Sequence, residues 1–223
     1  MVLVDLPYGT TDCAWDSVIA FDKLWEQYYR VAKENAAFVM TAQVPFDKVL
    51  GCSNIKDLRY EWVWIKNQAT GFMNAKKMPL KATENILVFY RKLPTFNPQM
   101  NAGRPYKSVK SLKHFVGSVY GKTGCHEGYE QVNEGTRCPK NELQFDVEVG
   151  LHPTQKPVPL MEYLIKTYTN PGELVLDNTM GSGTTGVAAV RCGRRFVGIE
   201  LDPTNFGIAE TRINSEYSQQ RLF

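Results

Sequence analysis

The run Leu174-Val175-Leu176-Asp177 and the loop Gly181-Ser182-Gly183-Thr184-Thr185-Gly186 that soon follows it carry the clearest fold signal in the chain. A short apolar run that ends in aspartate predicts a buried strand, and the loop predicts a glycine-rich turn into a helix. Glycines let a ligand approach the backbone closely, and the helix start offers free N–H groups. Glu200 ends the next expected strand, at the spacing of an acid that accepts ribose hydroxyls. The pattern predicts an α/β fold with a nucleoside-cofactor site.

A second run, Asp5-Leu6-Pro7-Tyr8, directly follows the apolar residues Val2-Leu3-Val4. Ligands in open α/β sheets bind at the carboxyl ends of strands, so one sheet can place both runs at one site. Only a helix, a strand and a helix are expected after Gly186, and the other strands must therefore come from before the loop. This order places Val2–Tyr8 beside the cofactor strand and disfavours a nicotinamide oxidoreductase, which carries its glycine loop early. No lysine follows the loop, which disfavours a phosphate-cradling P-loop.

Length and composition indicate one globular domain with a small insertion. The five cysteines are odd in number and scattered, which predicts reduced thiols, no metal site and a cytoplasmic location. No apolar stretch is long enough to span a bilayer. The net charge of +3 is too small to indicate a binding partner, but the distribution of the charges along the chain is informative.

Two stretches contain lysines and no acidic residue, 62–83 and 93–125. Such local bias suits a polyanion, although a solvated loop face explains it about as well. Within the second stretch four residues are the candidates for contact with such a polyanion: Arg104, Lys107, Lys110 and Lys113.

The remaining pattern alternates between strands and helices. Strands are expected at 2–4, 36–41, 60–65, 86–90, 173–177 and 196–201, and helices at 21–34, 44–50, 157–169, 184–192 and from 203. The region 93–150 has no strong period and is rich in Gly, Pro, Asn, Lys and Ser. It divides the chain into a catalytic half at 1–92, an inserted recognition lobe at 93–150 and a cofactor half at 151–223.

Four motifs in one order, DLPYGTT, the 93–150 region, HPTQKPVPLMEYLI and LDNTMGSGTTG, resemble the amino-methylating DNA methyltransferases of the permuted (β) class, especially small phage and prophage forms. The resemblance covers nearly the whole chain outside the recognition region. It implies a mostly parallel Rossmann-like sheet in permuted motif order and S-adenosylmethionine as cofactor. It also implies double-stranded DNA as the polyanion that the four basic residues contact, and a place in restriction-modification in a bacterial or phage-infected cell.

The resemblance assigns the Asp5 run to the target amine. An exocyclic amine is a poor nucleophile because its lone pair is delocalised into the base. The Asp5 carboxylate and the Leu6 carbonyl would accept its N–H groups and localise that pair. Pro7 would stiffen the turn, and Tyr8 would stack on a base flipped out of the duplex. Aspartate at the first position favours adenine N6 over cytosine N4.

The resemblance also implies which residues hold the cofactor. They are His152, Thr154, Gln155, Lys156, Asp177, Gly181, Gly183, Thr184, Thr185 and Glu200. Two positions depart from the family pattern: Leu6 replaces its first proline, and Asn178-Thr179 replaces Pro-Phe. A cytosine-N4 methyltransferase and a catalytically weak DNA-binding relative remain alternatives.

Met1 stands only four residues before Asp5, whereas relatives carry another strand and helix upstream. Loss of such a piece exposes a sheet edge and reduces the buried area. We therefore expect weak cofactor affinity and marginal stability, or compensation by a homodimer or a partner subunit.

Overall fold

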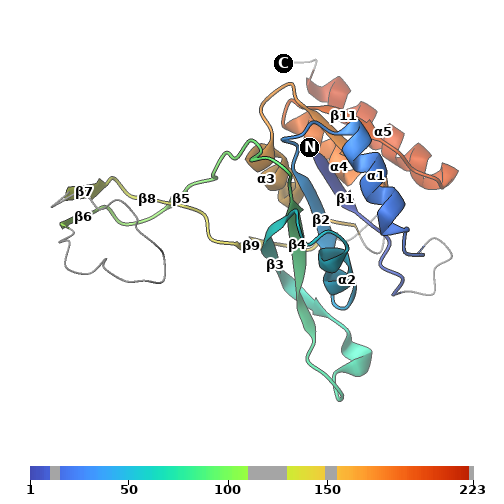
Figure 1. Cartoon of the computed structure of the whole chain (residues 1–223), viewed down its shortest axis with the longest axis horizontal. Coiled ribbons are helices and arrows are strands. Elements are labelled where there is room, and N and C mark those ends of the chain that lie inside the picture. The colour runs from blue at the N-terminus through green and yellow to red at the C-terminus, as the bar shows by residue number, and fades with distance from the viewer. Residues whose placement is uncertain (11–15, 110–129, 149–154, 221–223) are drawn as a thin grey trace. The chain divides into compact units, whose positions relative to one another are not determined.

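The computed structural model describes residues 1–10, 16–109, 130–148 and 155–220. Its main body is a seven-stranded sheet in the order β11-β10-β1-β2-β4-β3-β9 (Figure 1). Strands β1, β2, β10 and β11 run parallel, β4 runs antiparallel to β2 and β3, and β9 runs parallel to β3. The predicted α/β class with a mostly parallel sheet is confirmed. The sheet strands are β1 (Val2–Asp5), β2 (Phe38–Ala42), β3 (Leu58–Thr70), β4 (Lys81–Phe89), β9 (Glu142–Phe145), β10 (Leu174–Asp177) and β11 (Arg195–Gly198).

Helices cover both faces of this sheet (Figure 1). Successive residues of a strand point to opposite faces, so Val2 and Val4 pack with helices α1 and α2 while Leu3 packs with α3 and α4. Both faces of β1 are therefore buried, which explains its continuous apolar run. The helices are α1 (Phe21–Val31), α2 (Phe46–Ser53), α3 (Val158–Tyr168), α4 (Thr184–Arg191) and α5 (Pro203–Gln220), with a short 3-10 turn η1 (Phe72–Asn74).

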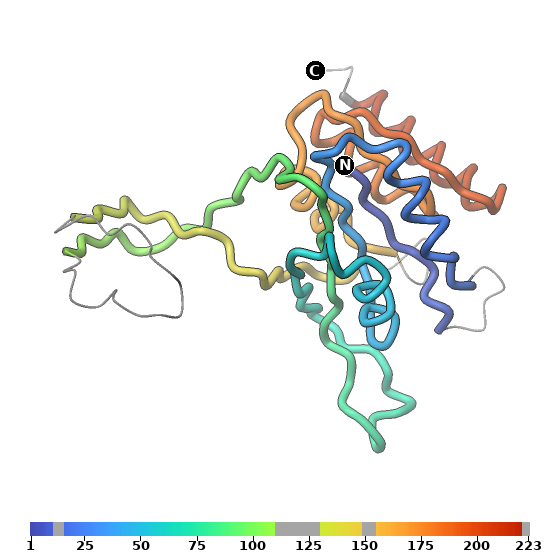
Figure 2. The backbone as a smooth tube through the Cα atoms, in the orientation of Figure 1, coloured from blue at the N-terminus to red at the C-terminus, as the bar shows by residue number. Residues whose placement is uncertain are grey.

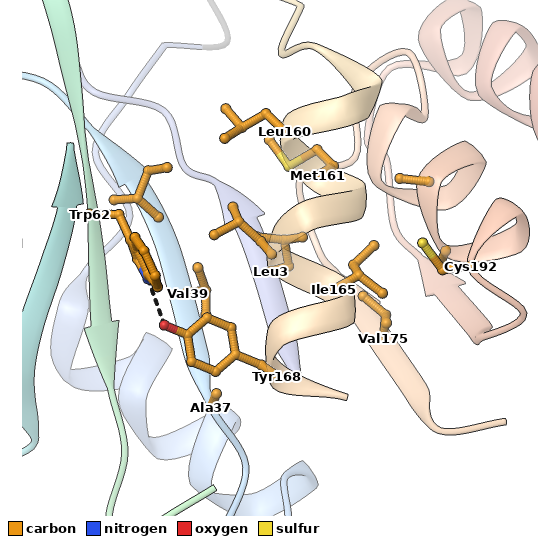
Figure 3. Packing of buried hydrophobic residues seen from close by; sticks show 14 of the residues in the cluster. Leu3, Ala37, Val39, Trp62, Leu160, Met161, Ile165, Tyr168, Val175 and Cys192 are labelled. Carbon is orange, nitrogen blue, oxygen red and sulfur yellow. Dashed lines mark hydrogen bonds between the residues drawn. The ribbon is translucent and has the colours of Figure 1, made fainter. Parts of the chain in front are cut away.

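The core on the α3 side shows how distant segments meet (Figure 3). Leu3 of β1 and Val39 of β2 pack there with Ile165 of α3, and all three are fully buried. The Trp62 indole N–H donates to the Tyr168 hydroxyl at 2.6 Å, which satisfies both buried polar groups. Trp62 and Trp64 are both buried, as their alternation on a strand predicts.

Residues Pro98–Pro139 form a second compact unit, which lies inside the expected 93–150 insertion. Its short strands pair as β5 (Asn101–Ala102) with β8 (Thr136–Arg137) and as β6 (Tyr106–Val109) with β7 (Glu130–Asn133). Strand β9 also falls within 93–150, but it pairs with β3 and belongs to the main sheet. The unit is thus shorter than the expected lobe, and its role in target recognition stays a prediction.

Three sheet strands differ from their expected bounds by three residues or more, and one of them is β4, which begins at Lys81 rather than residue 86. Strand β3 reaches Thr70 rather than residue 65, because the polar residues 66–70 continue the antiparallel hairpin with β4. Strand β11 ends at Gly198 rather than residue 201. Within the described part of the chain, no helix is long and apolar enough to cross a membrane, and no cluster of metal-ligating side chains occurs.

Candidate active site

Asp5 is the last residue of β1, and its carboxylate is surrounded by three donors. Oδ1 accepts the Tyr8 hydroxyl at 2.7 Å and the Thr41 hydroxyl at 2.5 Å, and Oδ2 accepts the Lys156 ammonium at 2.5 Å. A carboxylate has about four acceptor positions, so about one position, on Oδ2, remains for another donor. An N–H group of a substrate amine fits that position.

Lys156 belongs to a row of alternating charges that we call the charge chain: Asp5, Lys156, Glu84 and Lys66, of which all but the partly exposed Asp5 are buried. Its ammonium bonds Asp5 and lies 3.1 Å from Glu84 Oε1, while Lys66 lies 2.7 Å from Glu84 Oε2. Gln43 adds an amide donor to Glu84 at 3.1 Å. The two ammonium groups and the two carboxylates of the charge chain balance each other, and a buried charge is stable only when it is paired in this way.

The electrostatics of the charge chain follow from this pairing. Burial would raise the pKa of Glu84, but the Lys156 and Lys66 ammonium groups outweigh it and lower that pKa to about 2. Burial would likewise lower the pKa of Lys156, and the Asp5 and Glu84 carboxylates raise it instead. Glu84 and Lys156 therefore stay charged across the physiological pH range.

The Tyr8 ring is held on the same network. One face packs on Phe46 with ring centroids 4.9 Å apart, and its hydroxyl lies 3.1 Å from Glu84 Oε1 in addition to its bond to Asp5. Burial, and then the neighbouring carboxylates, raise the pKa of Tyr8 well above its usual value, so the hydroxyl stays a donor. Asp16 shapes the turn that follows, accepting the backbone N–H groups of Gly9 and Thr10 at 2.8 and 2.9 Å.

The loop after β10 contacts the end of β1 directly. Thr179 donates its hydroxyl to the Asp5 main-chain carbonyl at 3.0 Å, and its N–H bonds the Asp177 carboxylate at 3.0 Å. Burial raises the pKa of Asp177 to about 7, although bonds from Thr185 and Thr179 oppose the shift. Asn178 accepts the Tyr28 hydroxyl at 2.6 Å. Thr179, which departs from the family pattern, thus joins the two predicted motifs through a polar contact, whereas Asn178 connects the loop to α1.

The glycines of the loop have different structural roles. Gly181 has a φ of +52°, and a Cβ there would meet no atom within 4 Å, so its backbone faces open space. Gly183 has a φ of +82°, and a Cβ there would lie 2.8 Å from the Ala209 side chain of α5. Gly181 therefore fits a position of close ligand approach, whereas Gly183 is required for helix packing.

Glu200 ties this loop to the segment after β11. Its carboxylate accepts the Gly181 N–H at 2.8 Å through Oε2 and the Asp202 N–H at 2.9 Å through Oε1. Each oxygen retains an acceptor position, so the side chain can still bind a pair of hydroxyls. The predicted loop and the predicted acid are therefore neighbours in the structure.

The segment before α3 supplies a polar group that still lacks a partner. Gln155 donates its amide to Glu148 at 3.2 Å, but its side-chain oxygen is buried with no hydrogen-bond partner. A buried acceptor of this kind fits a bound ligand that carries N–H or O–H donors. The cofactor expected here has an ammonium group and ribose hydroxyls. His152 and Thr154 lie outside the described residues.

The expected DNA-binding residues belong to the second unit. Lys107 on β6 is ion-paired with Glu130 on β7, and the Arg104 carbonyl accepts the Arg137 guanidinium at 2.5 Å. Lys110 and Lys113 lie outside the described residues. Phosphate contact by these four residues stays a prediction.

Three functional candidates had no signal in the sequence motifs: Glu84, Lys66 and Thr41. Glu84 and Lys66 come from the antiparallel strands β4 and β3, and Thr41 from β2. For Glu84, the one indication in the sequence is that this charged residue stands two positions before the apolar run Ile86–Phe89. Lys156 was expected at the cofactor, whereas the structure places its ammonium on Asp5.

Comparisons with known proteins identify the family. The family model described as DNA methylase matches residues 1–211. The DNA adenine methyltransferase YhdJ of Escherichia coli K12 is 42% identical over 94% of this chain and 72% of its own length. The type II methyltransferase M1.MboII of Moraxella bovis is 27% identical over 96% of this chain and 90% of its own. A match to M2.DpnII of Streptococcus pneumoniae, 49% identical, spans 30% of this chain and about a quarter of that protein.

Solved structures show the same fold. The M1.HpyAVI–SAM complex superposes with a TM-score of 0.61 at 24% identity, covering 95% of this chain and 87% of that chain. The cytosine-N4-specific PvuII methyltransferase gives 0.62 at 16% identity, covering 98% and 84%. The family model and the YhdJ relative show that the chain belongs to the DNA methylase family. Its class is that of the DNA methyltransferases, with S-adenosylmethionine as the methyl donor.

Proposed function

We propose that the protein methylates the N6 amine of adenine in double-stranded DNA. The observation that carries this proposal is the Asp5 carboxylate, which keeps one free acceptor position at the end of β1 beside the loop that follows β10. The name and identity of the YhdJ relative support adenine over the cytosine-N4 alternative. The fold alone does not separate the two, because the cytosine-N4-specific PvuII enzyme shares it.

Asp5 and Leu6 would prepare the amine for attack. Asp5 Oδ2 accepts one N–H and the Leu6 main-chain carbonyl accepts the other, which localises the nitrogen lone pair. The nitrogen becomes positively charged as it is methylated, and the adjacent carboxylate stabilises that charge. Lys156 balances the carboxylate before the amine arrives and holds its orientation.

Gly181, Glu200, Asp177 and Gln155 would hold S-adenosylmethionine. The open backbone of Gly181 allows close approach, Glu200 has acceptor positions for ribose hydroxyls, and the unpaired Gln155 oxygen accepts a further donor. Asp177 would meet the cofactor's ammonium group. When bound, the cofactor supplies the electrophilic methyl group.

The test is direct identification of the product. The purified protein is incubated with DNA and S-adenosylmethionine carrying a deuterated methyl group, and the DNA is digested to nucleosides for mass spectrometry. We expect labelled N6-methyldeoxyadenosine, and none with Asp5→Ala. Labelled N4-methyldeoxycytidine would replace the adenine assignment, and the absence of any labelled nucleoside would refute the proposed activity.

Three further expectations stay predictions: association with a second subunit, a cytoplasmic location in a bacterial or phage-infected cell, and a permuted motif order relative to other methyltransferases. Sedimentation of the free protein measures the first. The match covers 72% of the length of YhdJ, and the proposal applies equally to a longer protein that contains this chain.

A further inference from the structure

The tip of the β3–β4 hairpin exposes large apolar side chains. Figures 1 and 2 show the hairpin extending well beyond its neighbouring strands in the main body. At the tip, Phe72, Met73 and Met78 are 71%, 99% and 50% exposed. Exposed apolar patches on soluble proteins often mark interaction sites, so these side chains are candidates for contact with a partner.

The same tip is strongly basic. Lys76, Lys77 and Lys81 are exposed around the apolar residues, and the sequence from 62 to 83 contains no acidic residue. Apolar side chains flanked by lysines match the chemistry of a polyanion that also offers apolar base surfaces. Proteins that insert apolar wedges between base steps of a duplex use this combination.

The register of the sheet places the tip at the same end as Asp5. Strand β4 runs antiparallel to β2, and the last residue of β2, Ala42, pairs with Asn85. Residues Lys81–Glu84 therefore extend past the carboxyl end of β2, where β1 also ends. Glu84 belongs to the charge chain on Asp5, and Lys81 lies about 10 Å further along at about 3.4 Å per residue. The turn with its apolar residues lies beyond that.

We propose that this tip binds the DNA duplex beside the flipped target base. Phe72 and Met73 contact bases or the deoxyribose edge of a groove, and Lys76 and Lys77 contact phosphates. The inference rests on the proposed function in one respect, that DNA is the substrate. A flipped base stays joined to its backbone, so the flanking duplex lies within one nucleotide's reach of Asp5.

Paired variants separate the apolar and the basic contributions. Phe72→Ala with Met73→Ala removes the apolar group, and Val31→Ala with Ile55→Ala is its control, because both control residues are exposed and Ile55 precedes the opposite end of β3. Lys76→Ala with Lys77→Ala removes two charges, and its control is a pair of lysines far from the tip. That pair is Lys33→Ala with Lys56→Ala, both exposed.

Affinity is measured by fluorescence anisotropy with a 30-base-pair duplex that the wild-type protein methylates, in the presence of S-adenosylhomocysteine. The apolar variant should raise the Kd about five- to hundredfold, the loss expected for a stacking side chain, and leave the salt dependence unchanged. The lysine variant should lower the slope of log Kd against log salt by about 2. Both variants should bind S-adenosylhomocysteine and unfold thermally like the wild type.

An unchanged Kd and an unchanged KM for DNA in both hairpin variants would overturn the proposal, as would equal losses in the control variants. Sedimentation provides the rival outcome: a wild-type dimer that the apolar variant converts to monomers, with DNA affinity per subunit unchanged, would assign the tip to a second copy of the chain. The two proposals fail in different measurements. If the proposed function is wrong, the wild-type protein transfers no methyl group to DNA. If the hairpin proposal is wrong, the wild type methylates DNA but the hairpin variants bind DNA as the wild type does.

Discussion

Replacing Glu84 by glutamine removes the negative charge that lies between two buried ammonium groups. Glu84 Oε1 is 3.1 Å from Lys156 and Oε2 is 2.7 Å from Lys66, and all three side chains are at most 9% exposed. The substitution keeps the shape of the side chain and leaves two positive charges against the single carboxylate of Asp5. The free energy of unfolding should fall, because a buried charge without a counter-charge is costly.

The magnitude follows from the pKa of Glu84. A pKa lowered from 4.5 to about 2 corresponds to about 3 kcal/mol of stability at neutral pH, at about 1.4 kcal/mol per unit. Breaking a buried pair by removing one partner costs about 3–5 kcal/mol, which agrees. Because the pKa is lowered on folding, the contribution is present above pH 4.5 and is lost as the pH falls from about 4.5 to about 2. The deficit of Glu84→Gln should shrink over that interval.

Urea unfolding followed by tryptophan fluorescence measures the effect as a shift of the midpoint of about 1 M or more. A second variant sharpens the test: Lys66→Met with Glu84→Gln restores charge balance, so it should be more stable than Glu84→Gln alone. Glu34→Gln is the control, since Glu34 pairs with Lys92 on the surface, and its midpoint should not move. If the effects of Lys66→Met and Glu84→Gln simply add, the charge chain is not a coupled unit.

Three predictions concern the other parts of the site. Asp5→Ala should abolish methyl transfer, measured as tritium incorporation into DNA, while S-adenosylhomocysteine affinity stays near wild type; activity near wild type would refute the role of Asp5. Glu200→Ala should weaken S-adenosylhomocysteine binding by about 1.5–3 kcal/mol in calorimetry, because a charged acceptor is lost; an unchanged affinity would place the cofactor elsewhere. Burial raises the pKa of Asp177 from 3.8 to about 7, so the stability of the neutral side chain is present below about pH 3.8, is lost as the pH rises from there to about 7, and levels off above 7. The wild-type free energy of unfolding should fall by about 1 kcal/mol from pH 6 to pH 8 relative to Asp177→Asn, and parallel pH profiles would contradict this.

Gly183 shows how the structure changes a prediction made from the glycine motif. The resemblance places Gly183 among the residues that hold the cofactor, so a side chain there would be expected to block the cofactor pocket. In the structure a side chain there meets Ala209 of α5, and the positive φ adds strain. A loss of function in Gly183→Val therefore reports helix packing, and Gly181 is the informative position for the cofactor.

Much of the architecture was readable from the sequence because its signals are local. Apolar runs such as Val2–Val4 and Val175–Leu176 predict strands buried on both faces, and the glycine loop predicts the turn into α4. Parallel strands align their carboxyl ends, so the meeting of the Asp5 run with the loop after Asp177 followed as well, and β1 pairs with β10.

Only the tertiary structure decided what surrounds Asp5. Glu84 and Lys66 come from an antiparallel hairpin, and no local pattern records that its strands bring opposite charges to one side of the sheet. Lys156 was identified as a site residue, but its partner depended on where β4 placed Glu84. A buried lysine binds the carboxylates that lie within reach, and which carboxylates those are is set by strand order and register rather than by sequence spacing.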